Sequence, residues 1–557
     1  MGNSLDHLFK GKDEPSRPIQ TKNGPIQGKR IIWEGERQVD AFLKIPFAKP
    51  PLGELRFKKP VAPEPWTEVL LTTEWAPRGI QNDPIFLTKW RFGEPSEDNL
   101  YLNVFTPVWD PSDEGFPVMV YIHGGGFVSD SAIKYGDIGL SKHMVAAHGV
   151  VVVTIQYRLG YLGFFTTGDA ACDDNVALWD MTMALQWVQD NISEFNGNPN
   201  NVTIFGQSAG GAAVDLLTLS PHSRDLFHKV CPMAGCANDE WVLNTNAVET
   251  CRLRAAKLEV TTQNTTELIS ELRKLPAMKF ATHLKLDASQ CSAKIQTEIG
   301  PRLDGDFFPK PLSELRREAP AKPRLIGTCE YEGLIIHILN MSILEIFAKS
   351  LTITKMEQMI SERITETAFP GDFVSLRADA WKRYFGDEKK PNKEAINRAF
   401  AKLYSDIFLN IGTQESVMEL LEVKPEADTY FYSFDYFNPK MWGLIGMKFP
   451  FKAATHCTEL SYLFNVGVIW NFDFNEDDYK MMDIMTKLWC NFAKYGNPNG
   501  IDEVPESRFE NFVWEKSIKE VPSRYLKICL KPTMQDSYQD SRPNFWLSIR
   551  KRAGSPK

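Results

Sequence analysis

Between residues 100 and 235, short runs of β-branched and other apolar residues alternate with longer stretches of helical periodicity. The short apolar runs are typical of buried strands. The predicted strands are Val118–Ile122, Val150–Tyr157, Val202–Phe205 and Lys229–Met233, and the predicted helices are Asn175–Ile192 and Ala209–Leu219. Strands that alternate with helices form βαβ units, so this region predicts an α/β fold with a large, mostly parallel central sheet.

The second half of the chain has a different pattern. From about residue 343 to 423 the sequence is helical, with charged residues on one face and apolar residues on the other. Strand-like runs return at Thr429–Tyr436 and Tyr525–Leu530, and no repeat or linker divides the chain. We expect one α/β domain over residues 17–545 with the helical block inserted over the sheet, a polar leader at 1–16 and a tail at 546–557.

The composition is that of an ordinary globular protein, since 43% of the 557 residues are hydrophobic and 24% are charged. Lys and Arg number 63 against 71 Asp and Glu, and the formal net charge of −8 argues against nucleic acid as a partner. No run reaches the roughly 18 apolar residues of a membrane-spanning helix, so we expect no transmembrane segment. The scattered His and Cys residues lack metal-ligand spacing, and no metal or other cofactor is expected.

The first residues, Met1-Gly2-Asn3-Ser4-Leu5-Asp6, lack the apolar run of a secretory signal. Gly2 fits the start of a myristoylation motif, but Asp6 stands where that motif has Ser or Thr. Lipidation at Gly2 is therefore a minor alternative to a plain polar leader. A single myristoyl chain gives only weak, reversible membrane binding.

The strongest chemical signal is the G-x-S-x-G sequence of Gly206, Ser208 and Gly210. A β-branched run precedes it and an Ala- and Leu-rich helical run follows it, which is the strand–turn–helix context that this motif requires. Small flanking residues let the backbone turn sharply while the seryl hydroxyl projects. The helix that begins there directs free N–H groups and a positive dipole end toward a reacting oxygen.

A glycine triplet, Gly124–Gly126, follows the strand that ends at Ile122. Bare backbone N–H groups in such a loop can form an oxyanion hole. A phosphate-binding loop is the alternative, but no G-K-[ST] and no G-x-G-x-x-G with a downstream acid is present. Together, the triplet and the serine motif favour acyl transfer over nucleotide binding.

The chain resembles the type-B carboxylesterases, the cholinesterase-like family of α/β-hydrolases. The resemblance covers residues from about 17 to 545 in the family's order. The matching segments are Ser96–Val104, Gly124–Gly126, Tyr157–Gly160, Ala184–Val188 and Phe195–Gly211. It implies an α/β-hydrolase fold with helices on both faces of the sheet and a helical insertion over the active site. The implied activity is hydrolysis of carboxylic esters through a catalytic triad.

α/β-Hydrolases place their triad in the order Ser, acid, His, so the base lies downstream of Ser208. The downstream histidines are His222, His228, His283, His337 and His456. The first two are too close to the serine motif, and the next two fall in predicted helices. His456 lies in a predicted loop before an apolar helix, which resembles the family's histidine loop, where an acid three residues later opens the next helix.

For the triad acid, residues 325–333 predict a strand that ends in an acidic loop. The family pattern places the acid immediately before a glycine, which implies Glu332. Glu330 is the nearest rival, with a solvated loop charge as its simplest interpretation. Spacing alone does not separate them, because Ser208, the acid and His456 are all distant in sequence.

The resemblance also implies further site residues. The oxyanion donors would be the N–H groups of Gly125, Gly126 and Ala209. Gln207 precedes the nucleophile where cholinesterases carry Glu, which disfavours choline esters and favours uncharged esters with apolar acyl groups. Trp241 falls where the family lines its acyl pocket, and Trp90 falls near the family's choline-stacking tryptophan. Core packing is the alternative for both tryptophans.

Two other functions remain open from the sequence. Some relatives in this family are catalytically silent binding or scaffold proteins, which typically lose a triad residue. A lipase or a juvenile-hormone-type esterase, the latter also with Gln before Ser, is the alternative within enzymes. The expected partner is a small-molecule ester, and the sequence does not predict an oligomeric state.

The nine cysteines bear on location. Secreted members of the family carry a disulfide cysteine where this chain has Asn99, and the positions around Gly79 and over Ala255–Leu275 hold no cysteine. We therefore expect small buried thiols, a cytoplasmic location, and no glycans on the N-x-[ST] sequences at Asn191, Asn201, Asn264 and Asn340.

Overall fold

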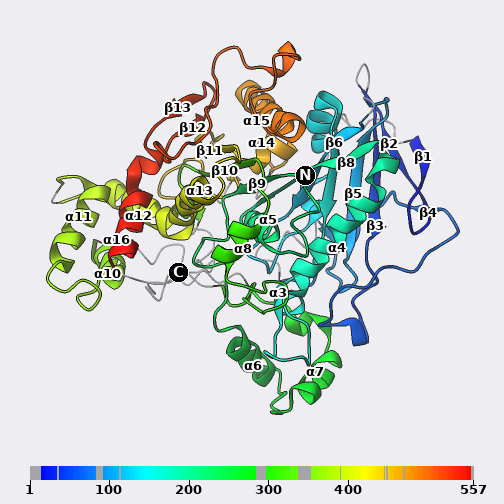
Figure 1. The fold of residues 1–557 in the computed structure, drawn as a ribbon, viewed down its shortest axis with the longest axis horizontal. Coiled ribbons are helices and arrows are strands. Elements are labelled where there is room, and N and C mark those ends of the chain that lie inside the picture. The colour runs from blue at the N-terminus through cyan, green and yellow to red at the C-terminus, as the bar shows by residue number, and fades with distance from the viewer. Residues whose placement is uncertain are drawn as a thin grey trace.

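One large sheet runs through the centre of the molecule (Figure 1). The structure, a computed structural model, describes residues 14–33, 37–82, 92–111, 114–283, 297–335, 353–388, 390–443, 446, 449–467 and 471–553. Within these residues the sheet has 13 strands in the order β1-β2-β3-β5-β7-β6-β8-β9-β10-β11-β12-β13, and β4 pairs with β2. The strands are β1 (Glu14–Gln20), β2 (Pro25–Ile31), β3 (Val39–Pro46), β4 (Leu70–Leu71), β5 (Tyr101–Pro107), β6 (Phe116–Ile122), β7 (Val151–Ile155), β8 (Gly197–Gln207), β9 (Lys229–Met233), β10 (Arg324–Cys329), β11 (Thr429–Phe434), β12 (Tyr525–Ile528) and β13 (Thr533–Gln535).

The centre of the sheet is parallel, and its edges are antiparallel apart from the short parallel pair of β2 and β4. Strands β7, β6, β8, β9, β10, β11 and β12 pair in parallel. Strands β1, β2, β3 and β5 add antiparallel pairs on one side, and β13 adds one on the other. Every residue of β7 is buried, as in a parallel strand covered on both faces. The prediction of a large, mostly parallel sheet is confirmed.

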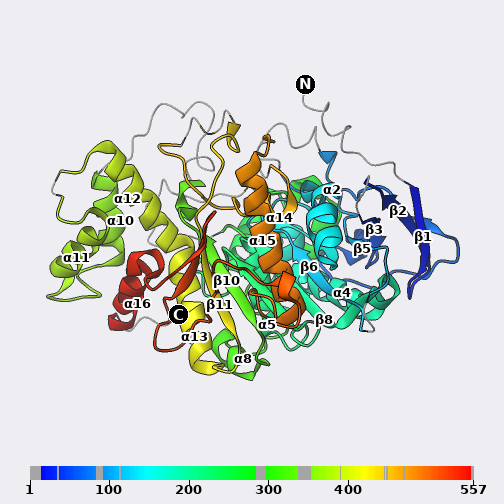
Figure 2. The same ribbon diagram turned by 90° about the horizontal axis from the view of Figure 1, so that it is seen from above.

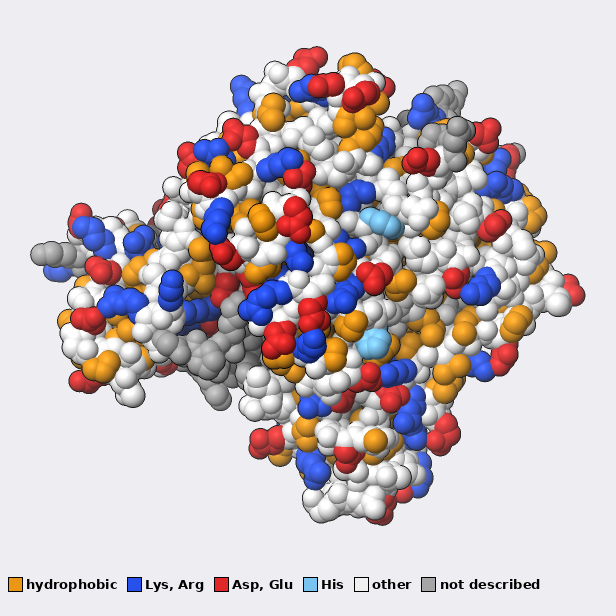
Figure 3. All heavy atoms as spheres, viewed as in Figure 1, with side chains coloured by type: hydrophobic (Ala, Val, Ile, Leu, Met, Phe, Trp, Pro, Cys, Tyr) orange, Lys and Arg blue, Asp and Glu red, His pale blue; other side chains and the backbone are white. Residues whose placement is uncertain are grey.

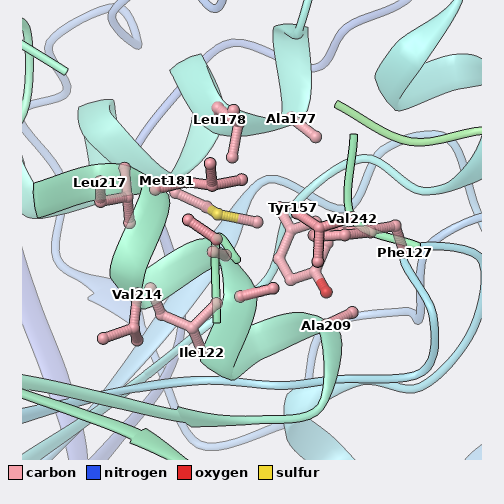
Figure 4. Close-up of a cluster of buried hydrophobic side chains, with 14 of the residues drawn as sticks. Ile122, Phe127, Tyr157, Ala177, Leu178, Met181, Ala209, Val214, Leu217 and Val242 are labelled. Carbon is pink, nitrogen blue, oxygen red and sulfur yellow. The ribbon is translucent and has the colours of Figure 1, made fainter. Parts of the chain in front are cut away.

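Alternate residues of the central strand β6 face two separate cores. In β6, Val118, Val120 and Ile122 belong to the cluster that includes α4 (Val176–Asn191) and α5 (Ala209–Leu219). Met119 and Tyr121 belong to the cluster that includes α15 (Glu476–Tyr495). Figure 2 shows helices on both sides of the sheet, and Figure 4 shows part of the first cluster.

The remaining helices include several that the sequence analysis does not predict. They are α2 (Ile138–Leu140), α3 (Gly160–Phe164), α6 (Ala247–Lys257), α7 (Thr265–Arg273), α8 (Leu312–Glu318), α10 (Ile353–Arg363), α11 (Phe373–Phe385), α12 (Lys393–Ser405), α13 (Ile411–Val423), α14 (Leu460–Phe464) and α16 (Arg542–Arg552). The predicted helical block corresponds to α10 through α13. In Figure 1 its α10, α11 and α12 lie beside α16, to one side of the central sheet.

The helical block reaches the carboxyl end of β10. A short 3₁₀ turn at Glu332–Ile335 follows that strand, and α12 packs directly on it. The backbone N–H of Gly333 donates to Ser405 Oγ at 2.8 Å. A Cβ atom added at Gly333 would lie 2.7 Å from Ala401 O, so this contact requires glycine. The block therefore holds the turn that begins with Glu332.

Some boundaries differ from those expected. Residues 14–16 belong to β1, and α16 continues to Arg552, so regular structure enters both predicted terminal segments. Strand β8 begins at Gly197, well before the predicted Val202, because Gly197 pairs with Phe116 of β6 and the register shifts before the next pair, Val118 with Val202. His283, predicted to be helical, lies in irregular backbone after the 3₁₀ helix Ala277–Phe280. His337 is outside the described residues.

A buried ion cluster fixes α5 against the rest of the fold. Asp215 of α5 is fully buried and accepts hydrogen bonds from Arg316 of α8 at 3.2 Å and from Arg324 of β10 at 2.6 Å. Burial opposes ionisation, but the two guanidinium groups hold the pKa of Asp215 well below its usual range. The helix that follows Ser208 is thus tied to the strand that precedes Glu332.

On the face drawn in Figure 3, acidic and basic side chains are interspersed over the surface. Among the described helices, none combines the length and the apolar character that crossing a bilayer requires. The described His, Cys, Asp and Glu residues include no group of three or more that could hold a metal ion.

Candidate active site

Ser208 sits in a sharp turn between β8 and α5. Its backbone has φ 60° and ψ −126°, a conformation that L-residues rarely adopt. Its N–H donates to Met233 O of β9 at 2.9 Å, which holds the turn at the carboxyl edge of the sheet. Such strained positions are enriched at active sites. The predicted strand–turn–helix around this serine is present.

The flanking glycines are required by close backbone crossings. A Cβ atom added at Gly206 would lie 2.6 Å from Ile122 O, and one added at Gly210 would lie 2.0 Å from the same oxygen. The end of β6 therefore passes directly against the turn. Any side chain at either position would push β6 and the turn apart.

The glycine loop after β6 lies against the same turn. A Cβ atom added at Gly124 would lie 3.0 Å from Ser208 Cβ and 2.5 Å from Gln207 O. Gly125 and Gly126 follow with φ of 86° and 62°. Ala209 is the first residue of α5, where backbone N–H groups have no partner within the helix. The three proposed oxyanion donors thus come from two segments that meet at Ser208.

His456 and Glu332 are in direct contact. His456 Nδ1 lies 2.6 Å from Glu332 Oε2, and both side chains are buried. The other carboxylate oxygen, Oε1, accepts the backbone N–H of Cys329 at 2.5 Å. Thr455 Oγ1 donates to Glu332 O at 3.3 Å and so ties the histidine loop to the acid's backbone. The structure brings together two residues that are 124 positions apart.

Glu330, the rival acid, faces elsewhere. Burial and the nearby Asp435 raise the pKa of its carboxyl to about 7, while Lys527 and Lys402 lower it. Its backbone N–H donates to Phe434 O of β11. The carboxylate that contacts His456 is therefore that of Glu332.

Gln207 contacts the histidine. Its Nε2 lies 3.3 Å from His456 Nδ1 and 3.4 Å from His456 Nε2, and its Oε1 accepts from Cys457 Sγ at 3.1 Å. The thiol fixes the amide so that the NH₂ group faces the imidazole. Ser208 Oγ makes no hydrogen bond to any described residue. In ligand-free sites such bonds are often long and shorten when substrate binds.

Trp241 is almost completely buried beside the site. Its Nε1 donates to Phe408 O at 3.0 Å, and its ring packs against those of Phe408 at 5.7 Å and Phe127 at 6.3 Å. Phe408 in turn lies 5.6 Å from the ring of His456. An aromatic wall thus leads from the glycine loop to the imidazole. Trp90 lies outside the described residues.

A family model described as "Carboxylesterase family" matches residues 15–546. The chain belongs to the Carboxylesterase family. It is an ester hydrolase with the α/β-hydrolase fold.

Three relatives illustrate the similarity. Esterase cest-33 of Caenorhabditis elegans is 38% identical, over 99% of this chain and 96% of the relative. The medium-chain fatty acyl-CoA hydrolase precursor of Anas platyrhynchos is 32% identical, over 98% and 95%. Neuroligin-3 of Mus musculus is 28% identical, over 96% and 69%.

The esterase has a second buried acid beside the Glu332–His456 pair. Glu459, which precedes the first residue of α14, is fully buried. Its Oε2 accepts from Cys329 Sγ at 2.9 Å, and its Oε1 is buried without a hydrogen-bond partner among the described residues. Burial and the neighbouring Glu332 raise the pKa of Glu459 to about 7. The sequence predicts an acid three residues after His456 at the start of a helix, which is Glu459, but it does not predict that this acid is buried.

We expect Glu459→Gln to change how the stability of the esterase depends on pH. The folded state holds a proton on Glu459 that the unfolded state loses near the ordinary glutamate pKa of 4.5, so wild-type stability falls as pH rises from there through about 7. Glutamine does not ionise and avoids this loss. The difference in melting temperature, variant minus wild type, should therefore increase between pH 5 and pH 8.

Thermal melts of both proteins at several pH values measure this difference. Glu422→Gln, at an exposed ion pair with Lys519, is the matched control and should give a difference that changes little over the same range. A flat difference for Glu459→Gln would contradict the raised pKa.

The eight cysteines in the described ranges are unpaired, and six of them are buried. Cys291 lies outside those ranges. Burial raises the pKa of the thiols of Cys231, Cys236 and Cys329. The thiols of Cys231 and Cys236 therefore behave as small apolar side chains, whereas that of Cys329 donates to Glu459.

Proposed function

We propose that the esterase cleaves uncharged carboxylic esters through a Ser208–His456–Glu332 triad and an acyl-enzyme intermediate. The observation that carries this proposal is the 2.6 Å contact between His456 Nδ1 and Glu332 Oε2, next to the strained turn that presents Ser208. A histidine held by a carboxylate can activate a hydroxyl that is otherwise a poor nucleophile.

The proposed reaction has two halves. His456 Nε2 takes the proton of Ser208 while Oγ forms a bond to the acyl carbon. The ester C–O bond then breaks, and the alcohol leaves with that proton. In the second half His456 takes a proton from water, the hydroxide oxygen bonds to the acyl carbon, and Ser208 recovers its proton as the acid departs. Glu332 holds the Nδ1–H tautomer and stabilises the imidazolium in both halves.

In this proposal the N–H groups of Gly125, Gly126 and Ala209 stabilise the negative oxygen of each tetrahedral intermediate. The meeting of the glycine loop and the start of α5 at Ser208 supports that role, because donors act best when they are fixed where charge develops. The start of α5 adds a positive dipole end on the same side.

We propose apolar acyl groups as the preferred substrates. The aromatic wall of Phe127, Trp241 and Phe408 supports this preference, since it offers carbon surface beside the reacting atoms. Gln207 carries no charge that would attract a cationic alcohol group. The similarity to a fatty acyl-CoA hydrolase points the same way. In a series of p-nitrophenyl esters, kcat/KM should rise from acetate to longer acyl chains and exceed that for thiocholine esters.

Labelling with a fluorophosphonate tests the proposal. We expect one adduct per chain, on Ser208, with loss of ester hydrolysis in proportion to labelling. Peptide mass mapping locates the adduct. An adduct elsewhere would contradict the assignment of the nucleophile.

A catalytically silent binding protein is the second candidate, because one relative is named Neuroligin-3. A wild-type chain that takes up no fluorophosphonate and hydrolyses no ester of the series would favour this candidate. A lipase differs from both by activity that increases on emulsified long-chain esters.

We also propose a cytoplasmic location. Position 99, where secreted relatives carry a disulfide cysteine, holds an asparagine whose Nδ2 donates to Tyr157 O at 3.1 Å. At the N-x-[ST] sites Asn191 and Asn201, the side-chain oxygen and nitrogen both form hydrogen bonds within the fold. Fractionation of cells together with glycosidase treatment tests this. A glycan on the exposed Asn264 would contradict it.

A further inference from the structure

Two carbonyl groups of the glycine loop have side-chain hydroxyl partners that neither the motif nor the triad accounts for. Tyr157, which follows β7, is fully buried. Its Oη donates to His123 O at 2.8 Å and to Gly124 O at 3.2 Å. Figure 4 draws Tyr157 in the buried cluster that also contains Phe127 and Ala209. The Tyr157 ring thus packs among apolar side chains, and its hydroxyl bonds to the backbone of the glycine loop.

Ser129 holds the next carbonyl. Its Oγ donates to Gly125 O at 3.1 Å, and the backbone N–H groups of Val128 and Ser129 each donate to the same oxygen at 3.1 Å. A Cβ atom added at Gly125 would lie 2.1 Å from Ser129 O, so the loop folds tightly back on itself.

Peptide geometry links these carbonyls to the N–H groups of the site. In a trans peptide the C=O of one residue and the N–H of the next lie in one plane and point in opposite directions. Fixing Gly124 O therefore fixes the direction of the Gly125 N–H, and fixing Gly125 O fixes that of the Gly126 N–H. Glycine peptides at positive φ have much conformational freedom, so the direction of these N–H groups depends on such anchors.

We propose that Tyr157 and Ser129 are positioning residues for the oxyanion hole. Their hydroxyl groups hold the carbonyls of Gly124 and Gly125 so that the N–H groups of Gly125 and Gly126 face the reacting oxygen before substrate arrives. This inference rests on the proposed function, in which those N–H groups stabilise the tetrahedral intermediate. Neither hydroxyl touches the substrate.

The ring of Tyr157 has a separate packing role, which makes the test specific. It stacks on the ring of His123 at 4.4 Å with an interplanar angle of 18°. His123 Nδ1 also lies 3.2 Å from Gly124 O. Tyr157→Phe keeps the stacked ring and removes only the hydroxyl that spans two carbonyls. Ser129→Ala likewise leaves the two backbone donors to Gly125 O in place.

We expect Tyr157→Phe to lower kcat by about 10- to 100-fold and to change KM by less than about twofold, because a mispositioned donor weakens only the transition state. Ser129→Ala should lower kcat by about threefold to tenfold, since two other donors remain. Affinity for a trifluoromethyl ketone, which forms a tetrahedral oxyanion on the serine, should fall in parallel with kcat. Affinity for the corresponding secondary alcohol, which forms no oxyanion, should not change.

Tyr430→Phe is the matched control. Tyr430 is a buried tyrosine near the amino end of β11, and its Oη donates to Asn497 Oδ1 at 3.3 Å. The variant removes one buried phenolic hydroxyl that does not contact the glycine loop. Its kcat should stay within twofold of wild type. The pH profile of all three variants should match that of wild type, because the His456–Glu332 pair is untouched.

The inference is overturned if Tyr157→Phe keeps wild-type kcat, if the ketone and the alcohol lose affinity equally, or if the apparent pKa of the profile moves. If Tyr157→Phe does not fold, Ser129→Ala decides by the same criteria. A wild-type chain without ester hydrolysis would instead refute the proposed function. An active wild type with unaffected variants refutes this inference alone.

Discussion

Ser208→Ala should abolish ester hydrolysis and leave the fold unchanged. The expected loss in kcat is about 10⁶-fold, the scale seen when the nucleophile of a serine triad is removed. The fold should tolerate the change because Ser208 Oγ makes no hydrogen bond to a described residue, so no buried partner is left unsatisfied. Initial rates with p-nitrophenyl butyrate and a thermal melt measure the two effects.

Ser141→Ala is a matched control for this experiment. Ser141 is also buried, and its Oγ has no hydrogen-bond partner among the described residues, but it lies in the π-helical turn Ser141–Ala146 between β6 and β7 and not in the turn between β8 and α5. The control should keep full activity. A Ser208→Ala protein that retains turnover within about tenfold of wild type would require another nucleophile.

The central strands and the serine motif could be predicted from sequence because their signals are local. Strands β6, β7, β9 and β11 are almost wholly buried and therefore consist mainly of apolar residues. The turn at Ser208 needs glycines within two positions on either side, and their crossing with Ile122 O explains why. These features depend on residues that are neighbours in sequence, so they can be predicted without knowledge of tertiary contacts.

The antiparallel edge was not predicted, and particular residues explain the difference. β1 is mostly exposed, and its two buried positions are three residues apart, so it has no alternating pattern. β3 is buried, but Asp40 interrupts its apolar run. Asp40 is nevertheless buried because Arg30 of β2 pairs with it at 2.7 Å. The ion pair with Arg30 on the neighbouring strand allows the Asp40 carboxylate to be buried.

In the active site, too, some residues could be predicted from local sequence and others could not. Ser208, the glycine loop and a histidine loop could be located from local pattern and family resemblance. The separation of Glu332 from Glu330 could not come from spacing, since both follow β10 and only one carboxylate reaches His456. The contacts of Gln207 with His456 and of Tyr157 with the glycine loop join residues that are remote in sequence. Single-chain sequence carries no direct signal for such pairs.

Glu332→Gln should lower kcat by about 10⁴-fold with little loss of stability, by analogy with amide replacement of other triad acids. The reason lies in the two donors that face this carboxylate. Oε1 accepts the Cys329 N–H at 2.5 Å, and Oε2 faces His456 Nδ1 at 2.6 Å. An amide has only one oxygen. If that oxygen keeps the Cys329 N–H, the NH₂ group faces Nδ1, and the imidazole must carry its proton on Nε2.

An imidazole with a proton on Nε2 cannot accept the proton of Ser208, so both halves of the reaction slow. Steady-state rates and the rate of fluorophosphonate labelling should fall together in Glu332→Gln, while the melting temperature reports the fold. Glu330→Gln is the control, because Glu330 follows the same strand but makes no hydrogen bond to His456, which contacts Glu332. Its kcat should stay within about twofold of wild type. A larger loss for Glu330→Gln than for Glu332→Gln would reverse the assignment of the triad acid.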